Sequence, residues 1–410
     1  MTTILCSGSR GDFQPYIALA QQLQKLGKSV RIAGGKSFEG LITGYGIGFY
    51  PLSVDYQTAE VDPQIIKDAQ SSDNPLKMLL TFNKMKAPVL HLTQEMYAAC
   101  EGSELIIYHP GATIGRFAGE ILGIPSVLAT PFSMHKTKEV ASVIAYGRYK
   151  LPTRFTYAML QQMLWMVSKP GVKACLKAKF GKLPKKFGCP YERVDARHPA
   201  VVSCSNHVFP RPGDWNENIH QFGYWFVEEN AQYTPPRELL GFLKSGDAPV
   251  YFGFGSVFNS DEKEHFVGII TDALQKCGKR GVLCGMGKVS GLPDTVFVID
   301  SIPHSWLFPR CAAVCHHGGA GTTAAGFAAG VPSANIPFSN DQFAWAHRAF
   351  DLGVGSKPIQ RKELDSAQLA DAISFAMQTP VVKKAQQLGE CIRGENGAAL
   401  AAKTIVEIMN

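Results

Sequence analysis

The chain has 410 residues, a length that predicts two domains, and its 45% hydrophobic and 18% charged residues exclude a mainly disordered or fibrous protein. Its net charge of +7 is unevenly distributed, because residues 132–190 hold 12 Lys or Arg and one acidic residue whereas the rest of the chain holds 29 basic and 33 acidic residues. A basic segment of +11 therefore sits in a chain that is otherwise at −4, which argues against a generally basic, nucleic-acid-binding protein.

The N-terminal half alternates short apolar runs with amphipathic segments. Thr3–Cys6 predicts a strand, a glycine-containing loop follows, and an apolar stripe that stops at Gly27 predicts a helix starting near Pro15. Further strands are predicted at Ser29–Ala33, Leu105–Tyr108, Ser126–Ala129 and Val201–Ser203, and helices at Lys77–Ala99 and Gly115–Leu122. This alternation predicts a parallel sheet with helices on both faces.

A second series of the same kind begins at Pro249, after a polar segment at residues 227–236 that ends in two prolines and predicts a linker. Its predicted elements are a strand within Pro249–Ser256, the helix Glu262–Cys277, the strands Gly281–Cys284, Val296–Ile299, Ala312–Cys315 and Ser333–Ile336, and a long last helix from Val381 to Asn410. We therefore predict an α/β chain of two doubly wound, Rossmann-like parallel-sheet domains that face each other across a cleft.

The domain boundaries are predicted from the same pattern. Residues 1–228 form the first domain, 229–236 the linker, 237–385 the second domain, and 386–410 a C-terminal helix that crosses back to the first. No apolar run is long enough for a transmembrane helix, the N-terminus does not resemble a signal peptide, and the ten cysteines form no CxxC pair. These features predict a cytoplasmic protein, peripheral to a membrane at most, without a metal site.

A glycine-rich turn, His316–Thr323, follows a predicted strand and opens a helix. Small residues let backbone N–H groups approach an anion, and a helix N-terminus favours negative charge, so the turn predicts phosphate binding. Close packing of helix on strand is the alternative interpretation. The spacing of Gly319, Gly321 and Ala324 also matches a dinucleotide fingerprint, but its late position in the domain and the two preceding histidines argue against NAD.

Several motifs together resemble a known family. The stretches Asp300–Cys311, His316–Gly326 and Pro337–Gln342 closely resemble the nucleotide-sugar signature of inverting family 1 glycosyltransferases, which have the GT-B fold. Gly8–Pro15, Pro210–Trp215, Gly223–Phe226 and Phe252–Ser256 look most like the sterol 3-β-glucosyltransferase branch. The resemblance runs from about Leu5 to Ile405, and the antibiotic glycosyltransferases are the close competitor because they share part of these motifs.

The resemblance implies a donor site without a metal. The backbone of Ile302 and the side chain of His304 would bind the base and ribose, although His304 could instead be a neighbour of a helix N-cap. Asp341 and Gln342 would bind sugar hydroxyls, their alternative being a solvated loop pair. The diphosphate would be held by residues of the two glycine-containing turns, namely Gly255, Ser256, His316, Gly318, Gly319, Gly321 and Thr322. Such donors stabilise a leaving nucleoside diphosphate, so no cofactor beyond the UDP-sugar is expected.

On the acceptor side, the resemblance makes Asp12 the general base that takes the proton of the acceptor hydroxyl, which typically contributes roughly 10²–10⁴-fold in rate. Capping of the following helix is the alternative role for Asp12. Arg10 would steady this carboxylate or the phosphates. Phe132, Met134 and His135 lie in a stretch that borders the acceptor in the family, where His135 is either a pocket wall or a second base.

The expected activity is inverting transfer of glucose, or a similar hexose, from UDP-glucose to a sterol-like or other lipophilic alcohol, giving a β-glycoside. Two alternatives remain: a TDP- or UDP-sugar transferase of natural-product biosynthesis, and a non-catalytic relative that binds sugar nucleotides or glycolipids. The basic segment contains an uncharged apolar run, Tyr157–Val167, followed by lysines, which suits transient contact with an anionic membrane surface. A buried helix followed by a solvated basic face is the alternative, and no nucleic-acid partner is expected.

Overall fold

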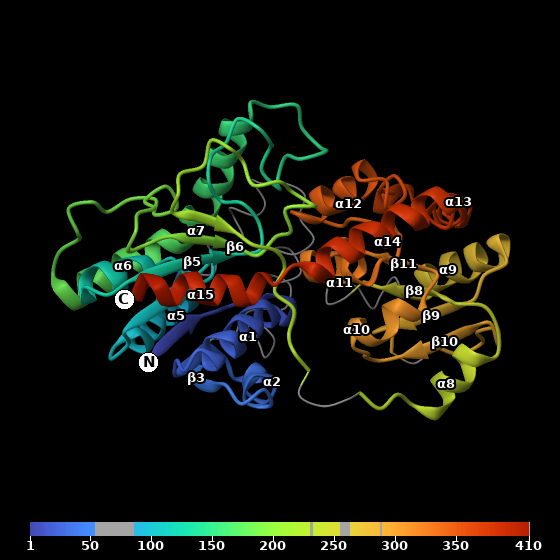
Figure 1. Ribbon diagram of the computed structural model, residues 1–410, viewed down its shortest axis with the longest axis horizontal. Helices are drawn as coiled ribbons and strands as arrows, with labels where there is room; N and C mark the ends of the chain where they lie inside the picture. The colour runs from blue at the N-terminus through green and yellow to red at the C-terminus, as the bar shows by residue number, and fades with distance from the viewer. Residues whose placement is uncertain (54–85, 230–232, 255–262, 288, 410) are drawn as a thin grey trace. The chain divides into compact units, whose positions relative to one another are not determined.

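The computed structural model describes residues 1–53, 86–229, 233–254, 263–287 and 289–409, and these form two compact units (Figure 1). The N-terminal unit comprises Met1–Ala145, Lys150–Asn230 and Glu395–Asn410. The C-terminal unit comprises Tyr146–Tyr149 and Ala231–Gly394. Each unit contains one wholly parallel sheet with helices packed against it, so the predicted fold class is confirmed.

The sheet of the N-terminal unit has seven strands in the order β3-β2-β1-β4-β5-β6-β7. All of its pairings are parallel, and β1 is buried at every position because it lies in the middle of the sheet with helices over both faces. Its strands are β1 (Thr2–Leu5), β2 (Val30–Gly35), β3 (Gly48–Leu52), β4 (Leu105–Tyr108), β5 (Ser126–Thr130), β6 (Ala200–Val202) and β7 (Ile219–Gln221).

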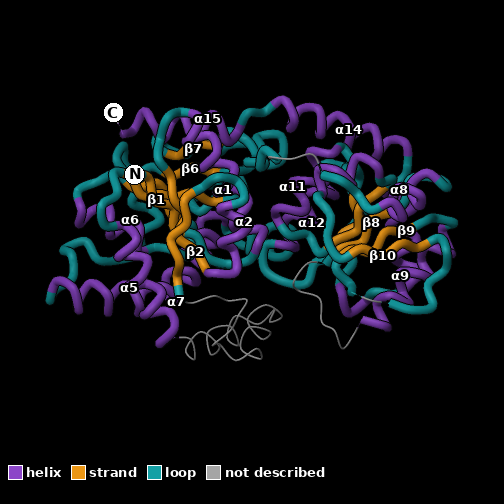
Figure 2. Tube along the Cα trace, turned by 90° about the horizontal axis from the view of Figure 1, so that it is seen from below, coloured by secondary structure: helices purple, strands orange, loops and turns teal. Residues whose placement is uncertain are grey.

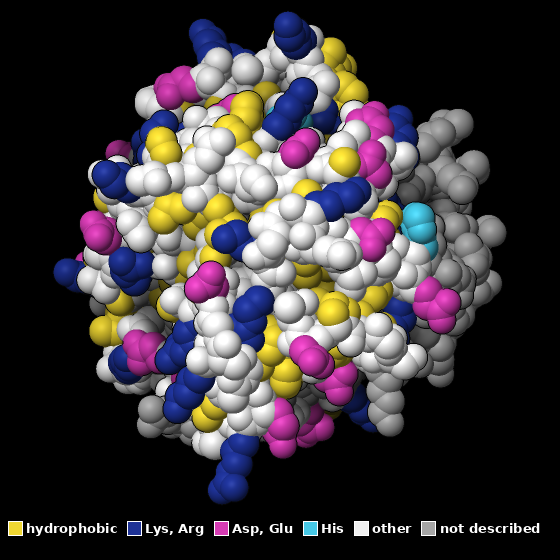
Figure 3. Space-filling view, turned by 90° about the vertical axis from the view of Figure 1, so that its right-hand side faces the viewer, with side chains coloured by type: hydrophobic (Ala, Val, Ile, Leu, Met, Phe, Trp, Pro, Cys, Tyr) yellow, Lys and Arg dark blue, Asp and Glu magenta, His cyan; other side chains and the backbone are white. Residues whose placement is uncertain are grey.

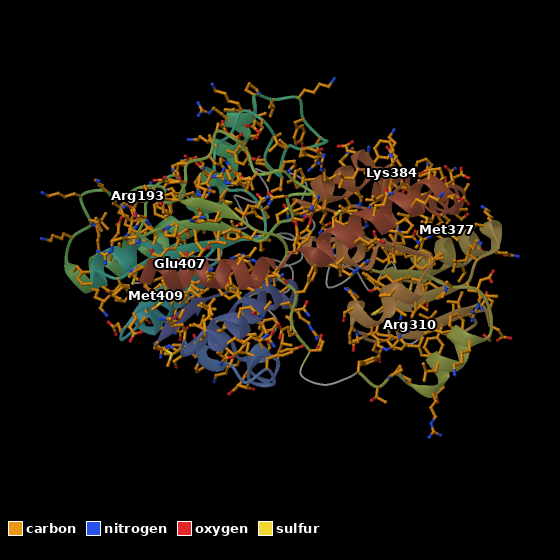
Figure 4. All side chains as sticks on the ribbon, viewed as in Figure 1. Arg193, Arg310, Met377, Lys384, Glu407 and Met409 are labelled. Atoms are coloured by element: carbon orange, nitrogen blue, oxygen red, sulfur yellow. The ribbon has the colours of Figure 1, made fainter. Side chains whose placement is uncertain are left out.

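Helices cover this sheet, as the purple and orange tubes of Figure 2 show. They are α1 (Arg10–Lys25), α2 (Glu39–Thr43), α5 (Lys86–Cys100), α6 (Ile114–Leu122), α7 (Thr153–Phe180) and α15 (Gly397–Met409). The last helix packs on α1, where Ala398, Ala401 and Ile405 join the core and Met409 lies against it, whereas Glu407 is exposed (Figure 4). The C-terminal residues therefore complete the hydrophobic core of the N-terminal unit.

The sheet of the C-terminal unit has five strands in the order β10-β9-β8-β11-β12. Its strands are β8 (Val250–Gly253), β9 (Gly281–Cys284), β10 (Val296–Ile299), β11 (Ala313–His316) and β12 (Ser333–Asn335). Its helices are α8 (Arg237–Lys244), α9 (Lys263–Cys277), α10 (His304–Leu307), α11 (Ala320–Ala329), α12 (Gln342–Asp351), α13 (Ser366–Ala376) and α14 (Thr379–Gly394). Alternate residues of β8 enter two separate hydrophobic clusters, Phe252 one and Tyr251 the other, so both faces of the sheet are covered.

Of the predicted helix Lys77–Ala99, residues 77–85 lie outside the described part of the chain, and two other predicted helices differ clearly in their bounds. The first begins at Arg10, not near Pro15, because Ser9 and Asp12 cap its first turn and Pro15 is tolerated early in the helix at the loss of one backbone bond. The last predicted helix is wrong as a single element, since α14 ends at Gly394 and α15 begins at Gly397. A Cβ on Gly397 would lie 2.6 Å from the carbonyl carbon of Gly223, so the chain turns there at a point where only glycine fits.

Strand order creates the same feature in both units. In the N-terminal sheet the chain runs outward from β1 to β3 and then returns to place β4 on the other side of β1. In the C-terminal sheet it runs from β8 to β10 and then places β11 on the other side of β8. Ligands of doubly wound sheets bind outside the carboxyl ends of the strands at such a reversal, so ligand-binding residues are expected in the loops after β1, β4, β8 and β11. No helix in the described part of the chain combines the length and apolarity that crossing a bilayer requires.

Candidate functional site

The loop after β1 places Asp12 at the reversal of the N-terminal sheet, in the first turn of α1. Its Oδ2 atom accepts two hydrogen bonds from Ser9, one from the backbone N–H at 2.7 Å and one from the hydroxyl at 2.9 Å. Gly8 has a φ of +132°, and a Cβ there would lie 2.3 Å from the same oxygen. These contacts fix the carboxylate in position and leave its other oxygen, Oδ1, facing away from the cap.

Asp12 therefore does cap the helix, as the alternative interpretation predicts, but it uses only Oδ2 to do so. A carboxylate at the third position of a helix supports the N-terminus through its neighbour's N–H, and such caps contribute about 1 kcal/mol. The side chain of Asp12 is 37% exposed, and its Oδ1 atom takes no part in the cap. Capping and proton transfer can be served by the same residue.

The loop after β4 brings His109 to this carboxylate. Its Nε2 atom lies 3.9 Å from Oδ1 of Asp12, a distance longer than a hydrogen bond but short enough for one to form after a small movement. The backbone N–H of Gly111 donates to its Nδ1 atom at 3.1 Å, so the neutral ring carries its proton on Nε2, the atom that faces Asp12. The two groups form an acid–base pair at the reversal of the sheet.

Burial lowers the pKa of His109 below its ordinary value, and the nearby Asp12 carboxylate opposes this shift without cancelling it. His109 is therefore uncharged near neutral pH and can donate an N–H to Asp12. Sequence reasoning missed this residue. The signal that could have found it is topological: β1 and β4 are adjacent, with Leu5 opposite Tyr108, so the residues that follow the two strands must lie side by side.

The remaining predicted acceptor residues differ in their exposure to solvent. Arg10 is exposed at the first position of α1, and among the described residues the Asp12 carboxylate contacts Ser9 and His109 but forms no ion pair with Arg10. Phe132 is half-buried just after β5, whereas Met134 and His135 are buried. Both therefore contribute to the interior beside β5 more than to an open surface.

His135 packs edge-on against Trp215, with ring centroids 6.2 Å apart. Burial lowers its pKa to about 4, and the opposite influences of Glu192 and of the Tyr191 backbone are smaller. Both of its ring nitrogens are shut off from solvent. Of its two predicted roles, the geometry favours a wall residue over a second base.

In the C-terminal unit, the reversal point is formed by the glycine-rich turn after β11. His316 ends this strand opposite Gly253 of β8 and is 1% exposed. Its Nδ1 atom accepts the backbone N–H of Gly318 at 3.0 Å, so the neutral ring carries its proton on Nε2. Burial, followed by the charges that His317 and His304 would carry, holds the pKa of His316 well below its ordinary value. The residue is thus a neutral N–H donor.

The same turn supplies backbone donors. Gly318 has a φ of +84°, Gly319 is the N-cap of α11, and Gly321 and Thr322 lie in the first helical turn, whose N–H groups have no partner within the helix. Gly321 is exposed, and a Cβ added there would meet nothing within 4 Å. A diphosphate could therefore approach this end of α11 closely, as the sequence predicts.

The turn packs directly on the start of α12, which carries the predicted sugar-binding pair. A Cβ on Gly318 would lie 2.7 Å from the carbonyl oxygen of Gln342. The Oε1 atom of Gln342 accepts the backbone N–H groups of Phe338 at 2.9 Å and Ser339 at 3.1 Å. Asp341 accepts the indole N–H of Trp345 at 2.8 Å. Both side chains are held by the protein, so the alternative of a merely solvated loop pair does not apply to Gln342, which is buried.

His304 and Ile302 lie on the neighbouring connection after β10. The ring of His304 stacks on Phe308 at 4.3 Å, and its Nε2 atom lies 3.1 Å from the hydroxyl of Tyr251. Ile302 is buried in the core, so only its backbone is available to a ligand. The structure therefore brings His304, His316 and Gln342 to one edge of the C-terminal sheet. The predicted phosphate ligands Gly255 and Ser256 lie outside the described residues.

Two family models match the chain, one in each half. Residues 2–141 match the model described as Glycosyltransferase family 28 N-terminal domain. Residues 285–408 match the one described as Erythromycin biosynthesis protein CIII-like, C-terminal domain. The first range contains the Asp12–His109 pair and the second contains the glycine-rich turn and the Asp341–Gln342 pair.

The chain is similar over nearly its whole length to curated sterol 3-beta-glucosyltransferases. It is 31% identical to one from Arabidopsis thaliana over 414 residues, which cover 98% of this chain and 64% of the relative. It is 34% identical to one from Cryptococcus neoformans over 434 residues, which cover 98% of this chain and 27% of the relative. The chain therefore spans less than two thirds of the length of these relatives.

Solved glycosyltransferases share the fold. The glycosyltransferase of kitacinnamycin superposes with a TM-score of 0.73 at 19% identity and covers 100% of this chain and 98% of its own. Glycosyltransferase VinC, solved in complex with dTDP, gives a TM-score of 0.69 at 16% identity, with 100% and 99% covered. At these identities the likeness establishes the arrangement of the elements, and the chemistry must be argued from the residues.

Proposed function

We propose that this chain is a GT-B glycosyltransferase that transfers glucose, or a similar hexose, from UDP-glucose to the hydroxyl of a sterol-like or other lipophilic alcohol. The observation that supports this most directly is the pair of arrangements at the two sheet reversals: a held, partly exposed carboxylate in one unit, and a neutral histidine beside the backbone N–H groups of a helix N-terminus in the other. The similarity to sterol 3-beta-glucosyltransferases supports the acceptor class.

The proposed reaction is a single displacement with inversion. Oδ1 of Asp12 takes the proton of the acceptor hydroxyl while the oxygen of that hydroxyl bonds to the anomeric carbon. The bond between the anomeric carbon and the diphosphate oxygen breaks at the same time, and the nucleoside diphosphate leaves with the electron pair. An α-linked donor therefore yields a β-glycoside.

Each unit would lower the activation barrier of the transfer in a different way. The Nε2–H of His109 faces Oδ1 and would orient the carboxylate toward the acceptor. The Nε2–H of His316 and the N–H groups at the start of α11 would bind the negative charge that develops on the leaving diphosphate. Asp341 and Gln342 would bind hydroxyls of the sugar. In this proposal the charge is stabilised by protein donors, so transfer needs no metal ion.

A lipophilic alcohol dissolves in a bilayer and hardly in water, so transient contact with a membrane is part of this proposal. The similarity to enzymes named for sterols supports an acceptor of this kind, and the basic segment supports an anionic surface as the place where it is met.

Transfer assays would test the proposal. UDP-glucose and TDP-glucose should be compared over sterols solubilised in cyclodextrin and hydroxylated macrolides, each with and without EDTA. We expect a β-glucoside of a sterol from UDP-glucose at a rate that EDTA leaves unchanged. Faster transfer from TDP-glucose to a macrolide would overturn the assignment of donor and acceptor, and loss of transfer in EDTA would overturn the metal-independent mechanism.

A further inference from the structure

We infer that the exposed face of α7 is the surface on which this enzyme docks to an anionic lipid bilayer. The inference rests on the proposed function, because it names the surface from which a lipophilic acceptor would be drawn. It depends on three observations: which side of α7 is buried, which apolar side chains remain outside, and where the lysines lie.

One side of α7 is buried against the rest of the N-terminal unit. The buried residues recur at helical spacing, and the helix packs on α5 with Gly171 so close that a Cβ would lie 2.5 Å from the hydroxyl oxygen of Thr93. Trp165 stacks on Phe117 with ring centroids 5.8 Å apart. The side of the helix that packs inward consists of Thr156, Tyr157, Leu160, Gln161, Trp165, Ser168, Gly171, Val172, Cys175 and Leu176. The helix therefore has a core-facing stripe that explains its position in the fold.

The opposite side keeps large apolar side chains in solvent. Phe155 is 54% exposed, Met159 39% and Met166 47%. Their spacing of four and seven residues places them on one line along the helix, separated from the buried stripe. Packing against α5 cannot account for this second apolar stripe, because these residues point the other way.

The same line continues as a row of cations. Lys169, Lys173 and Lys177 are all exposed and follow Met166 at spacings of three and four residues. The 28 residues of α7 include no Asp or Glu. Among the described residues, an ion pair is formed by Lys179 with Glu101, but none is formed by the three lysines of the row. The exposed face of α7 is thus apolar in its first half and positively charged in its second.

This pattern matches the surface of an anionic bilayer. Apolar side chains of a helix lying in the interface plane enter the boundary between headgroups and acyl chains, while lysines contact phosphates. At 1.5 Å per residue, the line from Phe155 to Lys177 is about 33 Å long, enough for several headgroups. A second copy of the chain fits less well, because two such faces would bring like charges together. The face drawn in Figure 3, by contrast, mixes basic with acidic side chains over its extent.

Vesicle co-sedimentation of the full chain tests the inference. The probes are vesicles of phosphatidylcholine alone and of phosphatidylcholine with about 30% phosphatidylserine. We expect binding that rises with phosphatidylserine content. Replacing the row of lysines together (Lys169→Glu, Lys173→Glu, Lys177→Glu) should weaken it by about 100-fold, and Met159→Gln with Met166→Gln by about tenfold. The matched controls change exposed residues elsewhere: Lys244→Glu, Lys362→Glu and Lys383→Glu for the charges, and Phe375→Ser with Leu400→Gln for the apolar pair.

All of these positions are exposed, so the variants should fold, and transfer to a cyclodextrin-solubilised sterol should stay within about twofold of the parent. Binding that ignores phosphatidylserine, or equal losses in the matched controls, would overturn the inference. So would a dimer that dissociates when Met159 and Met166 are replaced. If solubilised acceptor is not glycosylated at all, the proposed function fails, and vesicle binding still decides the role of the α7 face separately.

Discussion

The two sheet reversals of this molecule occupy equivalent places in two similar units and use different chemistry. In the N-terminal unit, two partly exposed side chains, Asp12 and His109, face each other with 37% and 19% exposure. In the C-terminal unit, His316 is 1% exposed and the other donors of the turn are backbone N–H groups at the start of α11. In the proposed transfer, the first arrangement would move a proton and the second would hold the charge of the leaving group, although both stand at the same point of the topology.

This comparison predicts that removing the negative charge of Asp12 abolishes most of the activity that depends on the N-terminal site. In Asp12→Asn the cap to Ser9 can persist, but the side chain can no longer take a proton, so kcat for transfer should fall by roughly 10²–10⁴-fold. Steady-state transfer and UDP binding by calorimetry would measure this, with UDP affinity unchanged. In the comparison variant Ser9→Ala, Asp12 keeps its charge and the backbone bond but loses the hydroxyl bond, so the change should cost about 1 kcal/mol of stability and far less activity than Asp12→Asn. Unchanged transfer in Asp12→Asn would remove Asp12 from the mechanism.

At the C-terminal site, removal of the N–H donor of His316 should instead lower the activity. We expect His316→Ala to lower kcat by roughly 10²–10³-fold, because an N–H directed at developing charge typically contributes that much. The effect should be the same for every acceptor and should also appear in slow hydrolysis of the donor by water. His347→Gln on α12, a half-buried histidine away from the turn, serves as the control. A defect limited to particular acceptors would contradict the assignment of His316 to the diphosphate.

Buried histidines of both units should make the fold sensitive to acid, whatever their role in activity. Burial lowers the pKa of His135 in the N-terminal unit and of His317 in the C-terminal unit to about 4. Because both values lie below the ordinary one of roughly 6.5, the unfolded chain binds these protons more readily, and stability present above about pH 6.5 is lost as the pH falls toward 4. For one such histidine the loss amounts to about 3 kcal/mol.

Chemical denaturation at pH 7 and pH 4 would measure this loss, with the transitions of the two units followed separately. In His135→Gln the pH dependence of the N-terminal transition should shrink by about 3 kcal/mol, while that of the C-terminal transition stays as in the parent. An unchanged pH dependence of the N-terminal transition would show that His135 does not titrate on unfolding.

The sequence predicted the fold class and much of the local structure, because these depend on local patterns. The strands Leu105–Tyr108, Gly281–Cys284 and Val296–Ile299 were predicted with the bounds that the structure has, since continuous apolar runs between turn residues are typical of parallel strands. The strands β3 and β7 escaped prediction for different reasons: β3 is only partly buried and contains Gly48 and Pro51, whereas β7 is only three residues long and two of them are polar. The glycine-rich turn was recognisable because all of its donors are consecutive.

Features that depend on tertiary contacts could not be predicted in the same way. His109 lies near Asp12 only because β4 is next to β1. The order of strands in a sheet cannot be deduced from the local pattern of apolar and polar residues. In α7, apolar residues occur on both sides of the helix, so periodicity alone could not distinguish Trp165, which is buried, from Met166, which is exposed. Which side packs inward was decided by α5 and α6.

The smallest expected effect concerns His109, and it separates two explanations of the N-terminal site. If His109 orients Asp12, then His109→Ala should lower kcat by about tenfold, with the acid limb of the pH–rate profile shifted to higher pH, and His109→Gln should restore part of the rate because it retains an N–H. A merely structural role would lower stability and leave the pH profile in place. In a double-mutant cycle, His109→Ala should cost nothing further once Asp12→Asn is present, since the two residues act as one unit. Additive losses would mean that His109 acts independently of the carboxylate, and the site would then rest on Asp12 alone.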